Sequence, residues 1–293
     1  MNGFAPFADI SWIAGRMLKN ISRKDETLRI FKWLAVTFSM YTKIPMPRFA
    51  WQEDDVSHSL LFFPLVGVLI GGLICLLNAV SPFRTLHPAV RILLTLAIPL
   101  LVTGGFHADG FMDTQDALHS YASSEKKQEI LKDPHIGAFA VISLIKWMLL
   151  YAAAIAAILL HELSDHKAVL FLGLSFVASR ALSGLTSLLF QKARKDGMLF
   201  RETEGNTRSG VLVLSLWLFG CLAFLVSLNV CAAAALLLTL GLFTVYYRKM
   251  TLREFGGVSG DTAGYFLMVC EIISALIQAL SVYCLPHVSL WSM

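Results

Sequence analysis

Seven long apolar runs constrain the fold of this chain more than any other feature of its sequence. At about 1.5 Å of rise per residue, most of them are long enough for a helix to cross about 30 Å of hydrocarbon. Charged residues make up only 15% of the chain, and its mean hydropathy of +0.67 is far above that of a soluble domain. The sequence therefore predicts an all-α, polytopic integral-membrane bundle of about seven transmembrane helices. The runs cover approximately residues 60–80, 89–104, 138–160, 168–190, 210–228, 231–247 and 264–285.

The residues before the first run predict a membrane-surface segment. Residues 30–41 are apolar, but Lys32 and Lys43 bracket them too closely for a crossing, so we expect an interfacial N-terminal helix there. Residues 1–29 lack the apolar core of a signal peptide and carry apolar residues at helical spacing, which predicts an extension in the cytoplasm or on the membrane surface. We expect residues 30–293 to form a single transmembrane catalytic domain. The spaced apolar residues are Phe7, Ile10, Ala14 and Met17.

The distribution of Lys and Arg predicts the orientation. If the N-terminus is cytoplasmic, the segments on its side hold 19 of the 24 basic residues, whereas the opposite side of the membrane holds only Arg84, Arg91 and Lys167. Because short cytoplasmic loops are enriched in Lys and Arg, we expect a multi-pass protein of the plasma or inner membrane with its polar loops in the cytoplasm. These segments are residues 1–59, 105–137, 191–209 and 248–263.

Charge and cysteine content exclude several other classes. The net charge of +4 follows from topology and from contact with anionic lipid, and no basic stripe with interleaved aromatic residues indicates nucleic-acid binding. The five cysteines lie within predicted spans at spacings that suggest neither a disulfide framework nor a zinc site. We therefore predict the lipid bilayer as a partner and no nucleic acid.

Residues 103–119 carry the strongest functional signal. Asp109, Asp113 and Asp116 stand at i, i+4 and i+7, so in a helix their carboxylates project within a sector of roughly 60°. Such a cluster repels itself unless a cation neutralises it, and Mg²⁺ binds one or two carboxylates together with phosphate oxygens and water. A solvated polar helix face is the alternative interpretation. His107 in the same segment is a candidate catalytic or phosphate-contacting residue.

Two further polar loops could complete a phosphate site. Residues 191–202 include Arg194 among several cations, which either hold a phosphate chain or simply mark an inside loop. Residues 256–264 place four glycines around Asp261, and Gly260 stands where backbone N–H groups could approach an anion before a helix begins. This loop is not a Walker motif, because it has no Gly-Lys-Ser/Thr.

Three charged residues fall well inside the predicted spans, away from the span ends. Glu271 is the single carboxylate there, and Lys146 and Arg180 are the two cations. Because an unpaired charge in lipid is costly, these residues predict a polar interior in which each faces a partner or a cavity.

Several of these segments, taken in order, resemble the cobalamin synthase family, the adenosylcobinamide-GDP ribazoletransferases. The resemblance begins near residue 30 and covers nearly all of the rest of the chain, and its aspartate-rich block is the most specific part. Departures at Ala108, Gln115, Pro134 and Ala140 remove no carboxylate. The segments are YTKIPMP (41–47), FPLVGVLIGG (63–72), TGGFHADGFMDTQDAL (103–118), LKDPHIGAFAV (131–141), SR (179–180), ARKDG (193–197) and GGVSGDTAG (256–264).

The resemblance implies a Mg²⁺-dependent membrane transferase of the last stage of vitamin B12 assembly. It would join adenosylcobinamide-GDP to α-ribazole, or to its 5′-phosphate, and release GMP. Association with other enzymes of cobalamin assembly stays a hypothesis. The residue roles that we infer are as follows: metal ligands Asp109, Asp113 and Asp116; a second acidic cluster of Asp133 and Asp261; phosphate binding by Lys132, Arg180, Arg194 and Gly260; and a general base that is either His107 or one of the aspartates.

Other membrane proteins with acidic clusters are the alternatives. CDP-alcohol phosphotransferases and UbiA-type prenyltransferases also place aspartates at the ends of transmembrane helices. Here no Ala-Arg follows the Asp-Gly at 109–110, and no Asn-Asp-x-x-Asp pair is present. A cation transporter would be expected to hold its ion near mid-membrane, whereas this cluster lies at a loop edge.

Overall fold

The computed structural model describes residues 26–161, 166–205 and 207–284, and within them the fold is all-α. Six of its helices are long and apolar enough to cross a membrane, and a seventh crossing can be formed by two helices joined at a sharp bend. This confirms the predicted membrane bundle. The six are α4 (Phe63–Ala79), continuous with α3 (Glu53–Ser59) and η1 (Leu60–Phe62), and then α8 (Ala138–Leu160), α9 (His166–Leu189), α11 (Thr207–Leu228), α12 (Val230–Phe255) and α13 (Gly260–Cys284).

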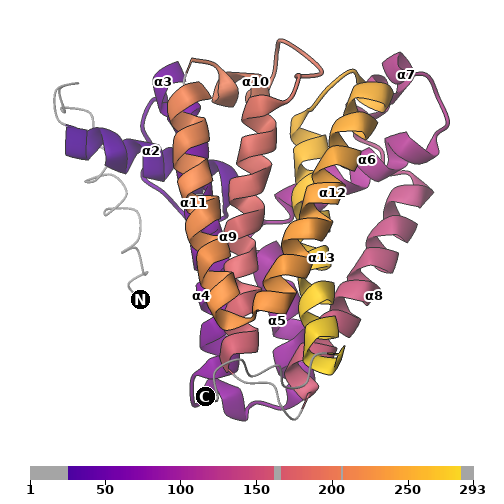
Figure 1. Cartoon of the computed structure of the whole chain (residues 1–293). Helices are drawn as coiled ribbons and strands as arrows, with labels where there is room; N and C mark the ends of the chain where they lie inside the picture. Colours follow the sequence, from indigo (N-terminus) through magenta and orange to yellow (C-terminus); the bar gives the residue numbers. More distant parts are fainter. Residues whose placement is uncertain (1–25, 162–165, 206, 285–293) are drawn as a thin grey trace, which may run out of the picture.

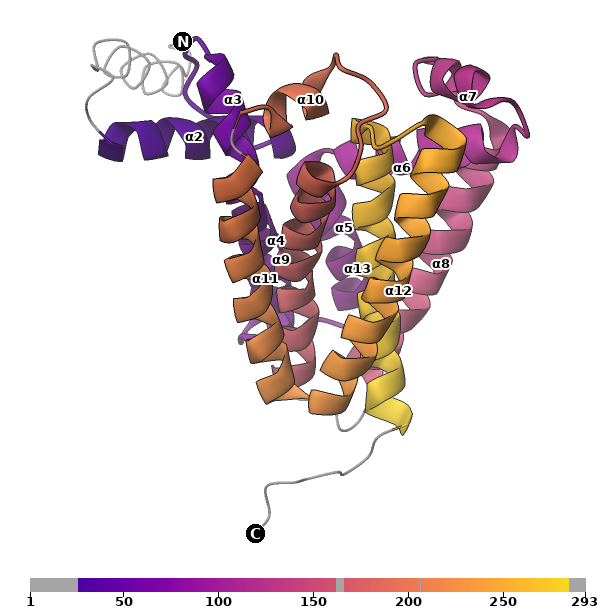
Figure 2. The same cartoon turned by 45° about the horizontal axis from the view of Figure 1, so that its top comes forward.

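The bent pair corresponds to the run predicted at residues 89–104 and to the aspartate segment after it. Helix α5 (Pro88–Thr103) stops at two glycines, and α6 (Phe106–His119) leaves at 92° to it. Gly104 and Gly105 have φ values of 66° and 81°, a region that side chains with a Cβ rarely enter. The chain therefore turns at the end of α5, and α6 lies across the end of the bundle rather than along its axis (Figure 2).

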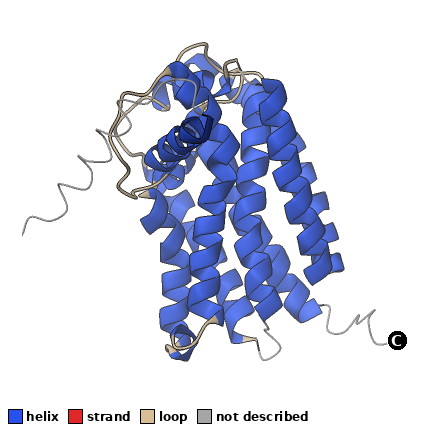
Figure 3. Ribbon diagram, turned by 90° about the vertical axis from the view of Figure 1, so that its left-hand side faces the viewer, coloured by secondary structure: helices blue, strands red, loops and turns tan. Residues whose placement is uncertain are grey.

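Helices α9 and α13 form the centre of the bundle. In the most apolar part of each, 83% of the residues of α9 and 67% of those of α13 are buried, against 17% for α11 and 28% for α8 and α12, which form the outside. Helix α4 packs closely on α9 because Gly67 and Gly71 have no side chain. A Cβ at either position would collide with the α9 backbone. Gly67 and Gly71 stand four residues apart as a GxxxG pair, a spacing that lets two helix backbones approach closely. Figure 3 shows the long helices side by side along one direction.

The predicted polar loops meet at one end of the bundle. Helices α2 (Glu26–Tyr41), α3, α6, α7 (Ser124–Ile130) and α10 (Met198–Thr203) all lie at the top of the molecule, together with the turn between α12 and α13 (Figure 1). Helix α2 crosses the bundle direction there, as expected for an interfacial helix. The predicted amphipathic residues Phe7, Ile10, Ala14 and Met17 lie outside the described residues. The division at residue 30 and the compartment that this end faces stay predictions.

Two expectations about the interior had different outcomes. Cys75, Cys221, Cys231 and Cys270 are free thiols within transmembrane helices, as expected. Lys146, in contrast, is exposed on the outer surface of α8, so its assignment to a polar interior was wrong. It lies eight residues after the start of α8, about 12 Å along the helix, and its long side chain can extend toward the headgroups.

The shared end of the polar loops generates a topology prediction. Single cysteines at Ser120, which follows α6, and at Leu86, in the connection at the opposite end, should react with a membrane-impermeant thiol reagent from opposite sides of the membrane. Both positions are exposed. Intact and inverted vesicles carrying the protein with its five native cysteines replaced provide the comparison. Reaction of both positions from the same side would contradict the arrangement.

Candidate functional site

The aspartate helix packs directly on the first turn of α13. A Cβ at Gly110 would lie 2.8 Å from the carbonyl oxygen of Asp261, and one at Gly264 would lie 3.1 Å from that of His107. Side chains larger than hydrogen at these positions would push the two backbones apart. The close approach brings Asp261, from the glycine-rich loop, to the aspartates of α6.

Four carboxylates therefore influence one another at this end of the bundle. Asp109 is exposed, and Asp113 and Asp116 are half-buried on α6. Partial burial raises the pKa of Asp113 to about 6, and the negative charges of Asp109, Asp261 and Asp116 add to this effect. The predicted helical face thus exists, and Asp261 extends it across to α13.

The acidic residues have different surroundings on α6. Asp116 points at Gly137, the residue that caps the N-terminus of α8, where any Cβ would collide with the carboxylate. A carboxylate at this position interacts favourably with the positive end of the α8 dipole. Among the described residues, no three His, Cys, Asp or Glu side chains converge into a complete metal site. The arrangement instead suits an ion that takes part of its coordination from substrate and water.

The structure gives no support to the predicted second acidic cluster of Asp133 and Asp261, because neither carboxylate acts on the pKa of the other. Asp133 is exposed after α7, and its carboxylate accepts hydrogen bonds from the backbone N–H of His135 at 2.9 Å and from the His135 ring at 2.6 Å. These contacts lower the pKa of Asp133, chiefly through the backbone hydrogen bond. Asp261 instead lies within electrostatic range of Asp109 and Asp113. Lys132 is exposed on the same turn as Asp133.

Arg194 is held beside the glycine-rich loop. Its Nη2 donates to the backbone oxygen of Gln128 at 2.7 Å, and its charge acts on Asp261. The loop itself is fixed by backbone hydrogen bonds from Val258 to Gln191 and from Ala193 to Val258, at 2.8 and 3.0 Å. Three segments that are distant in sequence therefore place one cation next to the acidic residues.

Gly260 begins α13, and local hydrogen bonds fix the start of that helix. The hydroxyl of Ser259 accepts from the backbone N–H of Thr262 at 3.2 Å, while the hydroxyl of Thr262 accepts from the N–H of Ser259 at 2.9 Å. This reciprocal cap resembles a capping box, and it fixes the first turn of α13 beside α6.

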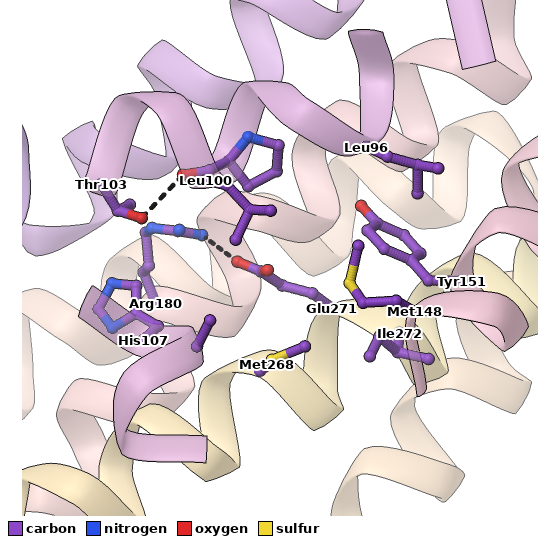
Figure 4. Close-up of a pocket in the computed structure, with 12 residues that line it drawn as sticks. Leu96, Leu100, Thr103, His107, Met148, Tyr151, Arg180, Met268, Glu271 and Ile272 are labelled. Carbon is purple, nitrogen blue, oxygen red and sulfur yellow. Dashed lines mark hydrogen bonds and ion pairs between the residues drawn. The ribbon is translucent and has the colours of Figure 1, made fainter. Parts of the chain in front are cut away.

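Arg180 lies below the aspartates, inside the bundle. Its Nη1 donates to Glu271 at 2.7 Å (Figure 4). The same nitrogen donates to the backbone oxygen of Phe176 at 3.0 Å, and the side chain is fully buried. The predicted polar interior is therefore an ion pair between α9 and α13. The phosphate-binding role inferred for Arg180 stays a prediction, since the guanidinium already has a carboxylate partner.

A small cavity adjoins this ion pair. His107 and Tyr151 line it together with Arg180 and Glu271 (Figure 4). Within the described part of the chain, the Nε and Nη2 of Arg180, the Nε2 of His107 and the hydroxyl of Tyr151 are buried without a hydrogen-bond partner. Buried polar groups of this kind usually bind water. Tyr151 could not be singled out from the sequence, because an isolated Tyr in an apolar run is typical of any transmembrane helix.

The fold and these residues together define a polytopic helical membrane protein with a carboxylate-rich site at one end of its bundle. A profile of the family described as cobalamin-5-phosphate synthase matches residues 33–279. No solved structure matches the chain.

Relatives named adenosylcobinamide-GDP ribazoletransferase match this chain over nearly the whole of their own length. The protein from Lachnoclostridium phytofermentans is 38% identical over 253 residues, which cover 84% of this chain and 93% of the relative. That from Clostridium perfringens strain 13 is 30% identical over 249 residues, 84% of this chain and 97% of the relative. That from Desulfitobacterium hafniense is 32% identical over 254 residues, 83% and 94% respectively. The chain belongs to the cobalamin-5-phosphate synthase family and is a transferase.

The electrostatics of α6 predict opposite effects of one substitution on activity and stability. Asp113→Asn should lower turnover by at least about 100-fold, if Asp113 contacts the metal directly. The same change should raise the melting temperature in metal-free detergent at pH 7, because it removes a self-repelling charge. The pKa of Asp113 is raised from 3.8 to about 6, so the wild-type protein loses stability as pH rises through that interval.

The difference in melting temperature should therefore vanish as pH falls from about 6 to about 4. Glu125→Gln is the matched control, because Glu125 is exposed on α7 and outside the cluster. It should leave turnover near the wild-type value. Near-wild-type turnover of Asp113→Asn at limiting Mg²⁺ would contradict the prediction that Asp113 is a metal ligand.

Proposed function

We propose that this protein joins adenosylcobinamide-GDP to α-ribazole, or to α-ribazole 5′-phosphate, and releases GMP. The observation that carries the proposal is the match to relatives of that name over more than nine-tenths of their length. The carboxylates shared by α6 and α13 support it, because a diphosphate substrate requires a site that can hold a cation beside phosphate oxygens.

The reaction replaces the phosphoanhydride bond of the donor by a phosphodiester bond to the acceptor. A ribose hydroxyl oxygen of the acceptor attacks the phosphorus on the cobinamide side of the diphosphate, and the bond from this phosphorus to the bridging oxygen breaks. GMP leaves with that oxygen, and the hydroxyl proton passes to a base. His107 and the aspartates of α6 are the candidates to accept it, and the unpartnered Nε2 of His107 supports the former.

We further propose Mg²⁺ as the cofactor. Asp109 and Asp113 on α6 and Asp261 on α13 would hold it, with Asp116 at the edge of the same face. The donor set fits, because hard carboxylate oxygens are the ligands that Mg²⁺ prefers, and the mutual repulsion at Asp113 is what a cation would relieve. When bound, the ion would neutralise charge on the diphosphate.

Protein groups would supply the rest of the phosphate site. Arg194 lies beside Asp261 and can contact a phosphate oxygen, and the first N–H groups of α13 after Gly260 can donate to another. Lys132 stands on an exposed turn and could act on a large substrate only from the rim. Arg180 lies inside the bundle and would act only indirectly, because its positive charge acts on His107.

The orientation belongs to the same proposal. The helix ends that carry the site also carry most of the basic residues, so we place them in the cytoplasm of a cell whose plasma or inner membrane holds the bundle. Nucleotide-activated substrates are available there. Association with other enzymes of cobalamin assembly would use this face.

Purified protein in detergent should form a base-linked corrinoid and GMP in equal amounts from adenosylcobinamide-GDP, α-ribazole and Mg²⁺. Chromatography of both products checks this, and EDTA should stop both. Equal amounts matter, because simple hydrolysis of the diphosphate would release GMP without joining the acceptor.

Parallel reactions with CDP-diacylglycerol and with a prenyl diphosphate provide the comparison. These donors share the requirement for charge neutralisation, so metal dependence alone does not distinguish them. Product from a lipid donor alone would overturn the proposed substrates while leaving the carboxylate site in place. Cation flux into vesicles without any transfer would instead favour a transporter.

A further inference from the structure

A second pocket lies on the other side of His107 from the Arg180 cavity. Its wall contains the rings of Tyr41, Phe63, Phe106 and His107, which come from α2, α4 and the first turn of α6. Ring centroids lie 4.2 Å apart for Tyr41 and Phe63, 5.4 Å for Phe106 and His107, and 5.7 Å for Phe63 and His107. Such a cluster offers surfaces on which a flat heterocycle can stack.

Glu202 of α10 is the one carboxylate that lines this pocket within the described residues. It is only 5% exposed, although it belongs to a short helix at the end of the bundle. The hydroxyl of Tyr41 lies close enough to act on it electrostatically, and no other side chain of the described residues does so. A carboxylate has acceptor positions for several hydrogen bonds, and among the described residues Tyr41 can fill only one of those of Glu202.

The burial of Glu202 carries a cost that a ligand could offset. Burial raises its pKa to about 7, and the nearby Tyr41 hydroxyl opposes this rise only in part. Ser183 and Ser187 of α9 add hydroxyls to the same pocket. A ligand that stacks on the rings could donate hydrogen bonds to the Glu202 carboxylate. These hydrogen bonds would offset the cost of burying it.

We propose that this pocket binds the guanine ring of the donor substrate and that Glu202 recognises its N1–H and its 2-amino group. Guanine presents these two donors side by side, which matches the two oxygens of a carboxylate. The base of α-ribazole has no N–H donor, so it would leave Glu202 unsatisfied. The inference rests on the proposed function, because that function supplies the guanine nucleotide.

The position of the pocket agrees with this assignment. Gly260 and Gly264, which flank the first turn of α13, line it, and Asp261 between them lies toward Asp109 and Asp113. A guanosine held in the pocket would therefore direct its phosphates toward the start of α13 and the aspartates. The nucleotide base and the metal ligands would contact opposite sides of the same helix start.

The test measures the Michaelis constants of the two substrates separately. Glu202→Gln should raise KM for adenosylcobinamide-GDP by about 10- to 100-fold, as expected for loss of a hydrogen bond to a charged group. KM for α-ribazole should stay within about 2-fold and kcat within about 3-fold, because Glu202 would contact a part of the donor that takes no part in the reaction. Glu204→Gln, an exposed neighbour at the end of α10, is the matched control and should change neither constant.

A donor analogue that carries hypoxanthine in place of guanine gives a readout that a purely structural role of Glu202 would not move. The analogue lacks the 2-amino group, so the wild-type enzyme should use it with a lower kcat/KM, and Glu202→Gln should lose most of this preference. If Glu202→Gln does not fold, Tyr41→Phe keeps the test open, because removal of the Tyr41 donor should also shift donor KM and leave acceptor KM unchanged.

Two kinetic results, and one result from ligand binding, would overturn the inference. An increase in KM for α-ribazole alone would place the acceptor in the pocket, and a fall in kcat with a changed pH profile at unchanged KM values would make Glu202 the proton acceptor. If the wild-type protein forms no product, the proposed function fails, and calorimetric titration with GMP and IMP then tests the pocket by itself. Preference for GMP that is lost in Glu202→Gln supports the inference, and equal binding of both contradicts it.

Discussion

The packing of α6 across the first turn of α13 is the contact on which the site depends. Gly110 permits it, because any side chain there would meet the backbone of Asp261. Gly104 and Gly105 make it reachable, because their positive φ values turn the chain by 92° after α5. The result is a carboxylate surface at the end of the bundle, built from two segments that are far apart in the sequence.

Beneath this surface the bundle contains a second polar site, the buried ion pair of Arg180 and Glu271. Arg180 and Glu271 join the two central helices through an ion pair that is removed from lipid. A buried pair of this kind offsets its own desolvation only when geometry and further hydrogen bonds are favourable, and two guanidinium nitrogens of Arg180 still lack partners in the described residues. His107 borders both this site and the aromatic pocket, so its position is coupled to each of them.

Much of this architecture could be predicted from the sequence, because hydropathy and helical spacing are local properties. The apolar runs gave the helices, and the spacing of Asp109, Asp113 and Asp116 gave their common face. Local patterns do not specify which distant segments meet. For this reason the approach of Asp261 to Asp109 and Asp113 was not predicted, and the proximity of Tyr41 to Glu202 had no sequence signal at all.

The central claim is that carboxylates of α6 and α13 bind one cation together, and binding of Mn²⁺ to the purified protein tests it most directly. Electron paramagnetic resonance titration in detergent should show Mn²⁺ that Mg²⁺ displaces. Asp261→Asn should weaken this binding by at least about 10-fold, as should Asp113→Asn, because the two helices share the ion. Wild-type affinity in Asp261→Asn, together with lost affinity in Asp113→Asn, would contradict the shared site.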